Sequence, residues 1–238
     1  MKKFMKFSVV ALGLMFAVQA NASGIEVSKD KKTVSLFMNT MGENKTSVKF
    51  EIPESIKQEV ISYNVSAFKV KVDDDSVVSG TGIYDEGSEM AKVNGELIYK
   101  SNLLTPGGEV AFVSSGDERS YTKGITLDDK VTEKDGKKTT TSKITGVDMD
   151  SVKSGFSLSM IKVNKEKYVF FLQQSSLEEM NKFNKNNVIF ELPVVKGWET
   201  FNTVNVKPGK VVRFDSGVYE SKGGNYKNVY VISIKNVQ

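Results

Sequence analysis

Gly155-Phe-Ser-Leu-Ser-Met-Ile161 and Lys167-Tyr-Val-Phe-Phe-Leu-Gln-Gln174 open the last third of the chain, residues 154–238, which decides the fold. Further apolar or alternating segments follow at residues 188–192, 200–206, 211–218 and 229–234. Turn-forming residues stand between the segments: Asn164, Asn186, Asn187, Pro193, Pro208, Gly209, Gly223 and Gly224. Short runs rich in Val, Ile, Phe, Tyr and Thr that end at Gly, Pro or Asn are typical of β-strands. The stretch therefore predicts a meander of short strands.

The rest of the chain repeats this pattern. Alternating or apolar segments are predicted as strands at residues 33–39, 46–52, 64–72, 77–85, 90–99, 109–113 and 119–125. A short helix is predicted at residues 55–61, after Pro53. A second helical candidate is residues 175–183, where Leu177, Met180 and Phe183 recur at every third position. We therefore expect a mainly β fold of antiparallel strands with one or two short helices.

The first 22 residues have the features of a secretory signal peptide. Lys2, Lys3 and Lys6 are followed by an apolar run at residues 7–18 and by the small-residue site Ala20-Asn21-Ala22. An uncleaved N-terminal anchor is the alternative, although the apolar run is shorter than the roughly 20 residues of a membrane span. We expect an exported protein of the periplasm or outer membrane.

Three regions are predicted. Residues 1–22 are the signal peptide, residues 23–64 a small N-terminal β region with a short helix, and residues 65–238 a larger β domain. Within that domain, residues 127–153 are rich in Lys, Asp, Glu and Thr and poor in apolar residues. Such a segment buries little surface, so we expect either a mobile insertion or a long exposed hairpin that turns near Asp135-Gly136.

Composition argues against several functions. The chain has 33 basic and 29 acidic residues, and without the three lysines of residues 1–22 the balance is 30 to 29. No nucleic-acid partner is therefore expected. The chain contains no His and no Cys, which removes disulfides, the usual general base, Cys nucleophiles and common zinc sites. Asp73-Asp74-Asp75 lacks the spacing of a calcium loop. We expect no enzyme, cofactor or metal.

Two aromatic residues are candidate interface residues. Trp198 is the single tryptophan, and Phe201 lies in the alternating segment 200–206. A lone Trp serves more often in a core or an interface than as a ligand platform, because its large area dominates packing.

A series of motifs over roughly residues 60–238 resembles the C-terminal domain of the secretins. The motifs are Thr105-Pro-Gly-Gly108, Gly155, Leu192-Pro193, Pro208-Gly209 and Gly217, in that order. Secretins are the outer-membrane channel proteins of type II and type III secretion, and those of type IVb pili are the most similar. The resemblance implies a shortened secretin-like component of a type IV pilus, secretion or conjugation apparatus.

This resemblance also implies the partners. The chain would form or join a ring at the outer membrane, by self-assembly or with secretin or pilus machinery proteins. The alternative is a periplasmic or surface β-sandwich that binds or adheres without channel activity. Alternating strands and the lack of catalytic groups fit both hypotheses.

Overall fold

The computed structural model describes residues 24–39, 45–73, 80–134, 137–185, 188–221 and 223–237. In these ranges it has one short helix, α1 (Glu54–Lys57), and thirteen strands. The strands are β1 (Gly24–Val27), β2 (Thr33–Asn39), β3 (Lys45–Glu51), β4 (Val60–Val72), β5 (Gly80–Asp85), β6 (Glu96–Pro106), β7 (Ala111–Lys134), β8 (Lys137–Lys162), β9 (Lys167–Lys185), β10 (Val188–Asn205), β11 (Lys210–Asp215), β12 (Tyr219–Ser221) and β13 (Gly224–Val237). The prediction of a mainly β fold with few helices is confirmed. The predicted signal peptide and the turn at Asp135-Gly136 lie outside the described residues.

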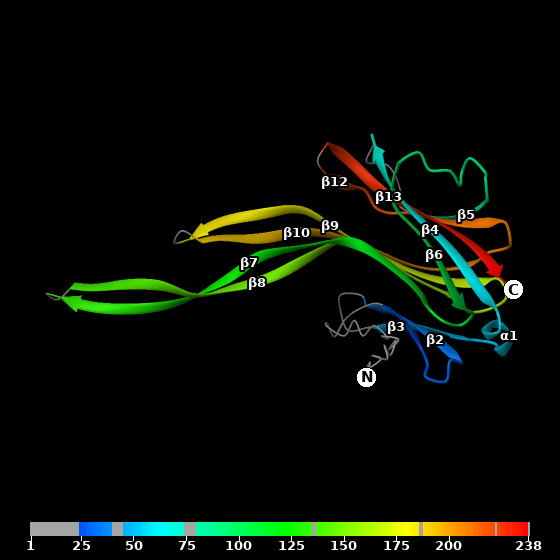
Figure 1. Ribbon diagram of the computed structural model, residues 1–238, viewed down its shortest axis with the longest axis horizontal. Coiled ribbons are helices and arrows are strands. Elements are labelled where there is room, and N and C mark those ends of the chain that lie inside the picture. The colour runs from blue at the N-terminus through cyan, green and yellow to red at the C-terminus, as the bar shows by residue number, and fades with distance from the viewer. Residues whose placement is uncertain are drawn as a thin grey trace, which may run out of the picture.

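The strands form three antiparallel sheets stacked as layers (Figure 1). The N-terminal sheet has the order β1-β2-β3, and the middle sheet has the order β10-β9-β8-β7. The third sheet has the order β5-β11-β13-β4-β6, with β12 paired to β13. The middle sheet therefore lies between the other two sheets. We call this layered part of the molecule, which is the described chain outside the arm defined below, the body.

Strand β9 shows how the sequence dictates this layering. Tyr168, Phe170 and Leu172 face the six-stranded sheet and belong to its core cluster. Val169 faces the other way, into the cluster shared with the N-terminal sheet, and Phe171 stacks on Phe201 with ring centroids 4.3 Å apart. A strand buried on both faces needs apolar residues at every position, which is why residues 168–172 do not alternate.

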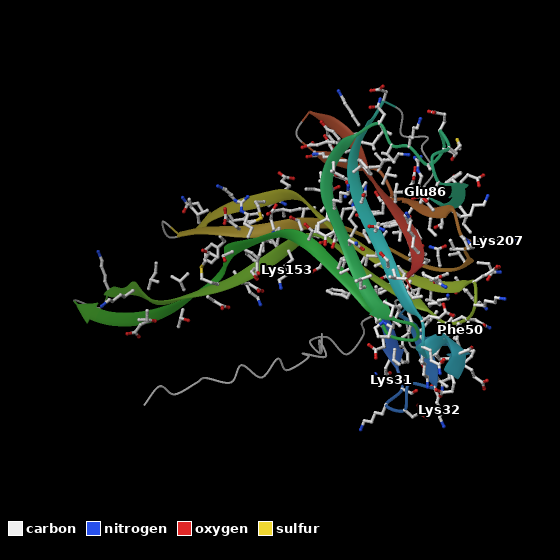
Figure 2. The ribbon with its side chains drawn as sticks, turned by 45° about the vertical axis from the view of Figure 1, so that its right-hand side comes forward. Lys31, Lys32, Phe50, Glu86, Lys153 and Lys207 are labelled. Carbon is white, nitrogen blue, oxygen red and sulfur yellow. The ribbon has the colours of Figure 1, made fainter. Side chains whose placement is uncertain are left out.

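Contacts outside the cores also hold the N-terminal sheet against the body. Lys31 pairs with Glu109 at the start of the β7 segment, and the Nζ atom of Lys167 lies 4.8 Å from the ring centroid of Phe50. Figure 2 shows Lys31, Lys32 and Phe50 on this lower layer.

Two long hairpins extend out of the body. Strands β7 and β8 have 24 and 26 residues, and β9 and β10 have 19 and 18. Their outer parts project together to one side, well past the other two sheets (Figure 1). We call these outer parts, residues 117–154 and 176–196, the arm. Residues 127–153, predicted as polar, lie in the outer part of β7 and β8.

The predicted helix at residues 175–183 is wrong, because this segment is part of strand β9. A β-bulge at Glu178 accounts for the first step of the misleading period, whereas Phe183 lies on the opposite face from Met180. The extra residue places Leu177 opposite Val195 and Met180 opposite Pro193, so that Leu177 and Met180 share one face of the strand. The helix predicted at residues 55–61 is limited to α1, since β4 already begins at Val60.

The predicted strand at residues 90–99 is also displaced. Strand β6 runs from Glu96 to Pro106, and residues 86–95 form turns. Arg213 holds these turns by donating a hydrogen bond of 3.0 Å to the carbonyl oxygen of Met90. The contact is long-range, so local sequence patterns do not report it.

Candidate assembly surface

The arm begins at a row of four small residues across the middle sheet. Gly116 pairs with Gly155, Gly155 pairs with Ser175, and Ser175 pairs with Gly197. The pairing between β8 and β9 ends at this row, whereas the β7–β8 and β9–β10 pairings continue beyond it. The single four-stranded sheet of the body thus divides into two hairpins. Lys153, labelled in Figure 2, lies just beyond the point of division.

The backbones of β7 and β8 come very close together in this row. A Cβ atom on Gly116 would lie 2.2 Å from the carbonyl oxygen of Ser154, and one on Gly155 would lie 2.1 Å from that of Ser115. Gly155 also has a φ of +145°, a conformation that residues with a side chain rarely adopt. Glycine is therefore required at both positions for this crossing of the strands.

The β9–β10 hairpin of the arm carries an exposed apolar face. Leu192 is 49% exposed and Phe183 is 53% exposed, and Val194 is exposed beside them. The strand register places Leu192 opposite Asn181 and Phe183 opposite Phe190. In the body, the same side of the middle sheet faces the six-stranded sheet, which covers it. In the arm, this side extends past the end of the six-stranded sheet and is exposed.

The β7–β8 hairpin carries a second exposed apolar group. Val147 and Met149 are each 56% exposed, and Ile144 is exposed next to them. Thr122 lies on the same face as Met149, because its hydroxyl lies 3.6 Å from the Met149 sulfur. We call the exposed residues of these two faces the arm apolar residues: Ile144, Val147, Met149, Phe183, Leu192 and Val194. Ile189 and Val195 are also exposed, on the opposite face of β10.

Charged side chains of the arm pair with one another. The ion pairs are Arg119–Glu191 and Lys182–Glu191, both at 3.6 Å, Lys123–Asp150 at 3.4 Å, and Lys153–Glu118 and Lys196–Glu178, both at 3.9 Å. A hydrogen bond from the Ser151 backbone N–H, with the ammonium of Lys123 nearby, lowers the pKa of Asp150. The arm thus combines compensated charge with exposed apolar side chains, a combination typical of interaction surfaces.

The two candidate interface residues pack inside the chain. Trp198 is half-buried against the core of the body, and a Cβ on Gly217 would lie 3.6 Å from its Cδ1 atom. Phe201 stacks on Phe171 and packs against the cluster beneath the N-terminal sheet. The structure therefore places neither aromatic ring on the arm.

The residues of the family resemblance fall at separate places. Gly155 lies in the row at the base of the arm, and Leu192 and Pro193 lie on β10 of the arm. Pro208 and Gly209 form the turn between β10 and β11, where Gly209 has a φ of +78° and accepts a hydrogen bond from the Glu86 N–H. Sequence analysis did not predict that Gly116, Ser175 and Gly197 meet Gly155 in one row; isolated glycines within strand patterns were the available signal.

Buried charges in the body have structural partners. The Lys162 ammonium, 1% exposed, lies 2.5 Å from a carboxylate oxygen of Glu59 and 3.2 Å from the side-chain oxygen of Asn236. Asp215 accepts hydrogen bonds from Arg213 and Lys227. Within the described residues, no group of three acidic side chains could hold a metal ion.

In the described ranges, none of the helices is long and apolar enough to cross a membrane. No protein-family model, curated protein or solved structure matches the chain. The resemblance to the secretins therefore stays a prediction.

Proposed function

We propose that this chain is an exported structural subunit of a bacterial envelope apparatus, a shortened secretin-like component that forms or joins a ring at the outer membrane. The observation that carries the proposal is the arm. It consists of two long hairpins that leave the protein core with their apolar residues exposed. These strands are far longer than the usual five or six residues. Their outer parts bury little apolar surface within one chain.

The topology of the middle sheet suits pairing between copies. Strands β10 and β7 are its two outer strands, and they run in opposite directions because the sheet is antiparallel with four strands. Strand β10 of one copy would therefore continue the antiparallel order when it pairs with β7 of the next. Closing such a series into a ring removes the exposed edges that an isolated sheet must protect.

The test is the size and shape of the protein without residues 1–22. We expect sedimentation velocity to show a concentration-dependent assembly, and negative-stain microscopy to show rings. In cells that produce the full chain, we expect the assembly in the outer-membrane fraction. A protein that stays monomeric at every concentration, and that leaves with the soluble fraction, would overturn the proposal.

Matched variants separate the arm from the body. Phe183→Ser combined with Leu192→Ser removes exposed apolar groups from the arm and should abolish assembly. Ile83→Ser combined with Leu104→Ser removes exposed apolar groups from the six-stranded sheet and should leave assembly intact. Equal effects of the two double variants would show that the arm is not the contact surface.

A periplasmic or surface binding or adhesion protein is the second candidate. The closed body with its two covered core clusters favours it, because such a body needs no other copy to bury its apolar residues. This candidate predicts a monomer that binds one envelope component saturably. Binding measured with immobilised monomer distinguishes it from the ring.

A further inference from the structure

The two hairpins of the arm are not joined by strand pairing, although β7 and β10 lie close to each other. Beyond the row of Gly116, Gly155, Ser175 and Gly197, the ladder between β8 and β9 stops. Among the described residues, polar contacts bridge the hairpins at two places. The Ser175 hydroxyl donates to the Lys153 carbonyl oxygen at 2.9 Å, and Arg119 lies 3.6 Å from Glu191.

These two contacts differ in kind. The Ser175 contact lies at the row itself, so it fixes the base of the arm and not the angle between the hairpins. The Arg119–Glu191 pair lies further out and joins β7 to β10. Arg119 is about half exposed, whereas the Glu191 side chain is 19% exposed. Salt screens the Arg119 side of the pair, and a pair at 3.6 Å with one exposed partner is weak, so Glu191→Gln or salt should open it.

The backbone at the row can absorb a change of angle. Gly116 and Gly155 face each other without side chains, and glycine has the widest range of backbone conformations. Strand β8 continues 18 residues beyond Gly155, to Lys137, which corresponds to roughly 60 Å of strand. A rotation of about 10° at the row would therefore move the tip of the β7–β8 hairpin by about 10 Å.

We infer that the Gly116–Gly155 crossing is a joint on which the β7–β8 hairpin swings relative to the β9–β10 hairpin, with the Arg119–Glu191 pair as the latch that holds the two in contact. The joint belongs to the single chain and does not depend on the proposed ring. Opening the latch separates the faces of the hairpins that lie against each other, and it changes the direction in which the arm apolar residues point.

The test measures the distance between the hairpins directly. The chain has no cysteine, so spin labels at Ser120→Cys and Asn184→Cys, both exposed positions, report only on this distance. In monomeric protein, pulsed electron paramagnetic resonance should show a broad distribution. Glu191→Gln, and separately high salt, should shift its mean to longer distances by about 2 Å, the displacement of Ser120, which lies four strand residues from the joint, for a rotation of about 10°.

Matched glycine variants locate the joint. Gly116→Ala should alter the distribution, because its Cβ would meet the Ser154 carbonyl at 2.2 Å. Gly124→Ala lies in the same hairpin, but its Cβ meets Asp148 at 3.6 Å, an ordinary contact, so it should leave the distribution unchanged. A narrow distribution that neither Glu191→Gln nor salt moves would overturn the inference, as would identical effects of the two glycine variants. If Gly116→Ala does not fold, the distances measured for Glu191→Gln and at high salt still test the inference.

Discussion

The body and the arm use the same strands in opposite ways. In the body, the six-stranded sheet covers one face of β7 to β10 and the N-terminal sheet covers part of the other, and the fully buried residues include Leu158, Phe170 and Leu172. In the arm, the same four strands carry Thr, Lys, Asp and Glu, with Val147, Met149 and Phe183 exposed. Burial therefore stabilises the body, whereas cross-strand hydrogen bonds and side-chain pairs must support the arm.

This difference indicates that contacts in the body contribute most of the free energy of unfolding, whereas the arm leaves its side chains exposed. A substitution in the body should change the free energy of unfolding. A chemically matched substitution in the arm should change it little, because the arm residues lose few contacts. The following predictions pair a body variant with an arm variant and run from the largest expected effect to the smallest.

Phe170→Ala should destabilise the protein by about 4 kcal/mol, because Phe170 is fully buried and packs 5.4 Å from the Phe214 ring. Phe183→Ala in the arm should cost less than about 0.5 kcal/mol, because Phe183 is exposed. Urea denaturation followed by circular dichroism measures both. Similar losses for the two variants would contradict the division between body and arm.

Glu59→Leu should cost about 3 kcal/mol, because it leaves the buried Lys162 ammonium without its carboxylate. Glu59→Gln keeps a hydrogen-bond acceptor and should cost less. The arm counterpart is Glu118→Leu, which breaks an exposed pair with Lys153 at 3.9 Å and should cost about 0.5 kcal/mol or less. Urea titrations measure the free energy of unfolding of these variants. A cost for Glu118→Leu as large as that for Glu59→Leu would show that arm charges are structural.

Stability should fall in acid because of Asp215. Burial opposes ionisation of this carboxyl, but hydrogen bonds and charge from Arg213 and Lys227 outweigh it and lower the pKa of Asp215 below 3.8. A carboxyl group whose pKa is lower in the folded than in the unfolded protein stabilises the fold. This stabilisation is complete above the unfolded-state pKa and is lost as the pH falls through the folded-state pKa. We expect Asp215→Asn to cost about 2 kcal/mol at pH 7 and to reduce the loss of stability below about pH 4.

The arm again provides the control for this pH effect. Asp150 also has a lowered pKa, but its side chain is exposed and solvent screens its partners, so Asp150→Asn should change the pH dependence of unfolding much less than Asp215→Asn does. Urea midpoints at several pH values between 2.5 and about 7 measure both variants, over the range in which carboxyl groups titrate. A pH profile of Asp215→Asn that matches the parent protein would refute the assignment.

Tyr230→Phe should have the smallest effect, about 1 kcal/mol. The buried Tyr230 hydroxyl donates to the Gln174 side-chain oxygen at 2.9 Å, and so links the six-stranded sheet to the middle sheet beside the base of the arm. Tyr121→Phe removes an exposed arm hydroxyl at 3.4 Å from Asp150 and should have no measurable effect. Thermal unfolding compares the two. A larger shift for Tyr121→Phe would reverse the comparison.

Local patterns predicted much of the fold but failed at specific places. The alternating segments 33–39, 46–52 and 64–72 predicted strands that the structure contains as β2, β3 and β4. Residues 175–183, predicted as a helix, are part of β9, and the edge strand β6 runs from Glu96 to Pro106 where a strand was predicted at residues 90–99. Both failures have one cause, since pairing with a distant strand overrides local preference.

The candidate assembly surface was less predictable than the fold. A hairpin was one of two alternatives for the polar residues 127–153, and the other hairpin includes residues 175–183, which were predicted as a helix. The base of the arm depends on Gly116, Gly155, Ser175 and Gly197 meeting in one row. These residues are separated by up to 81 positions (197 − 116). Only the register of three ladders aligns them, so inspection of each glycine in isolation could not identify the row.

The sequence by itself determined that the protein is mainly β, that residues 167–174 form a strand, and that residues 127–153 bury little surface. These properties follow from side-chain chemistry, which is local. Only the tertiary structure decided that three sheets stack, that the middle sheet divides at a row of small residues, and that Trp198 and Phe201 pack inward. Those outcomes depend on which strands pair and in which register, and strand pairing is a long-range choice made by burial and backbone hydrogen bonding together.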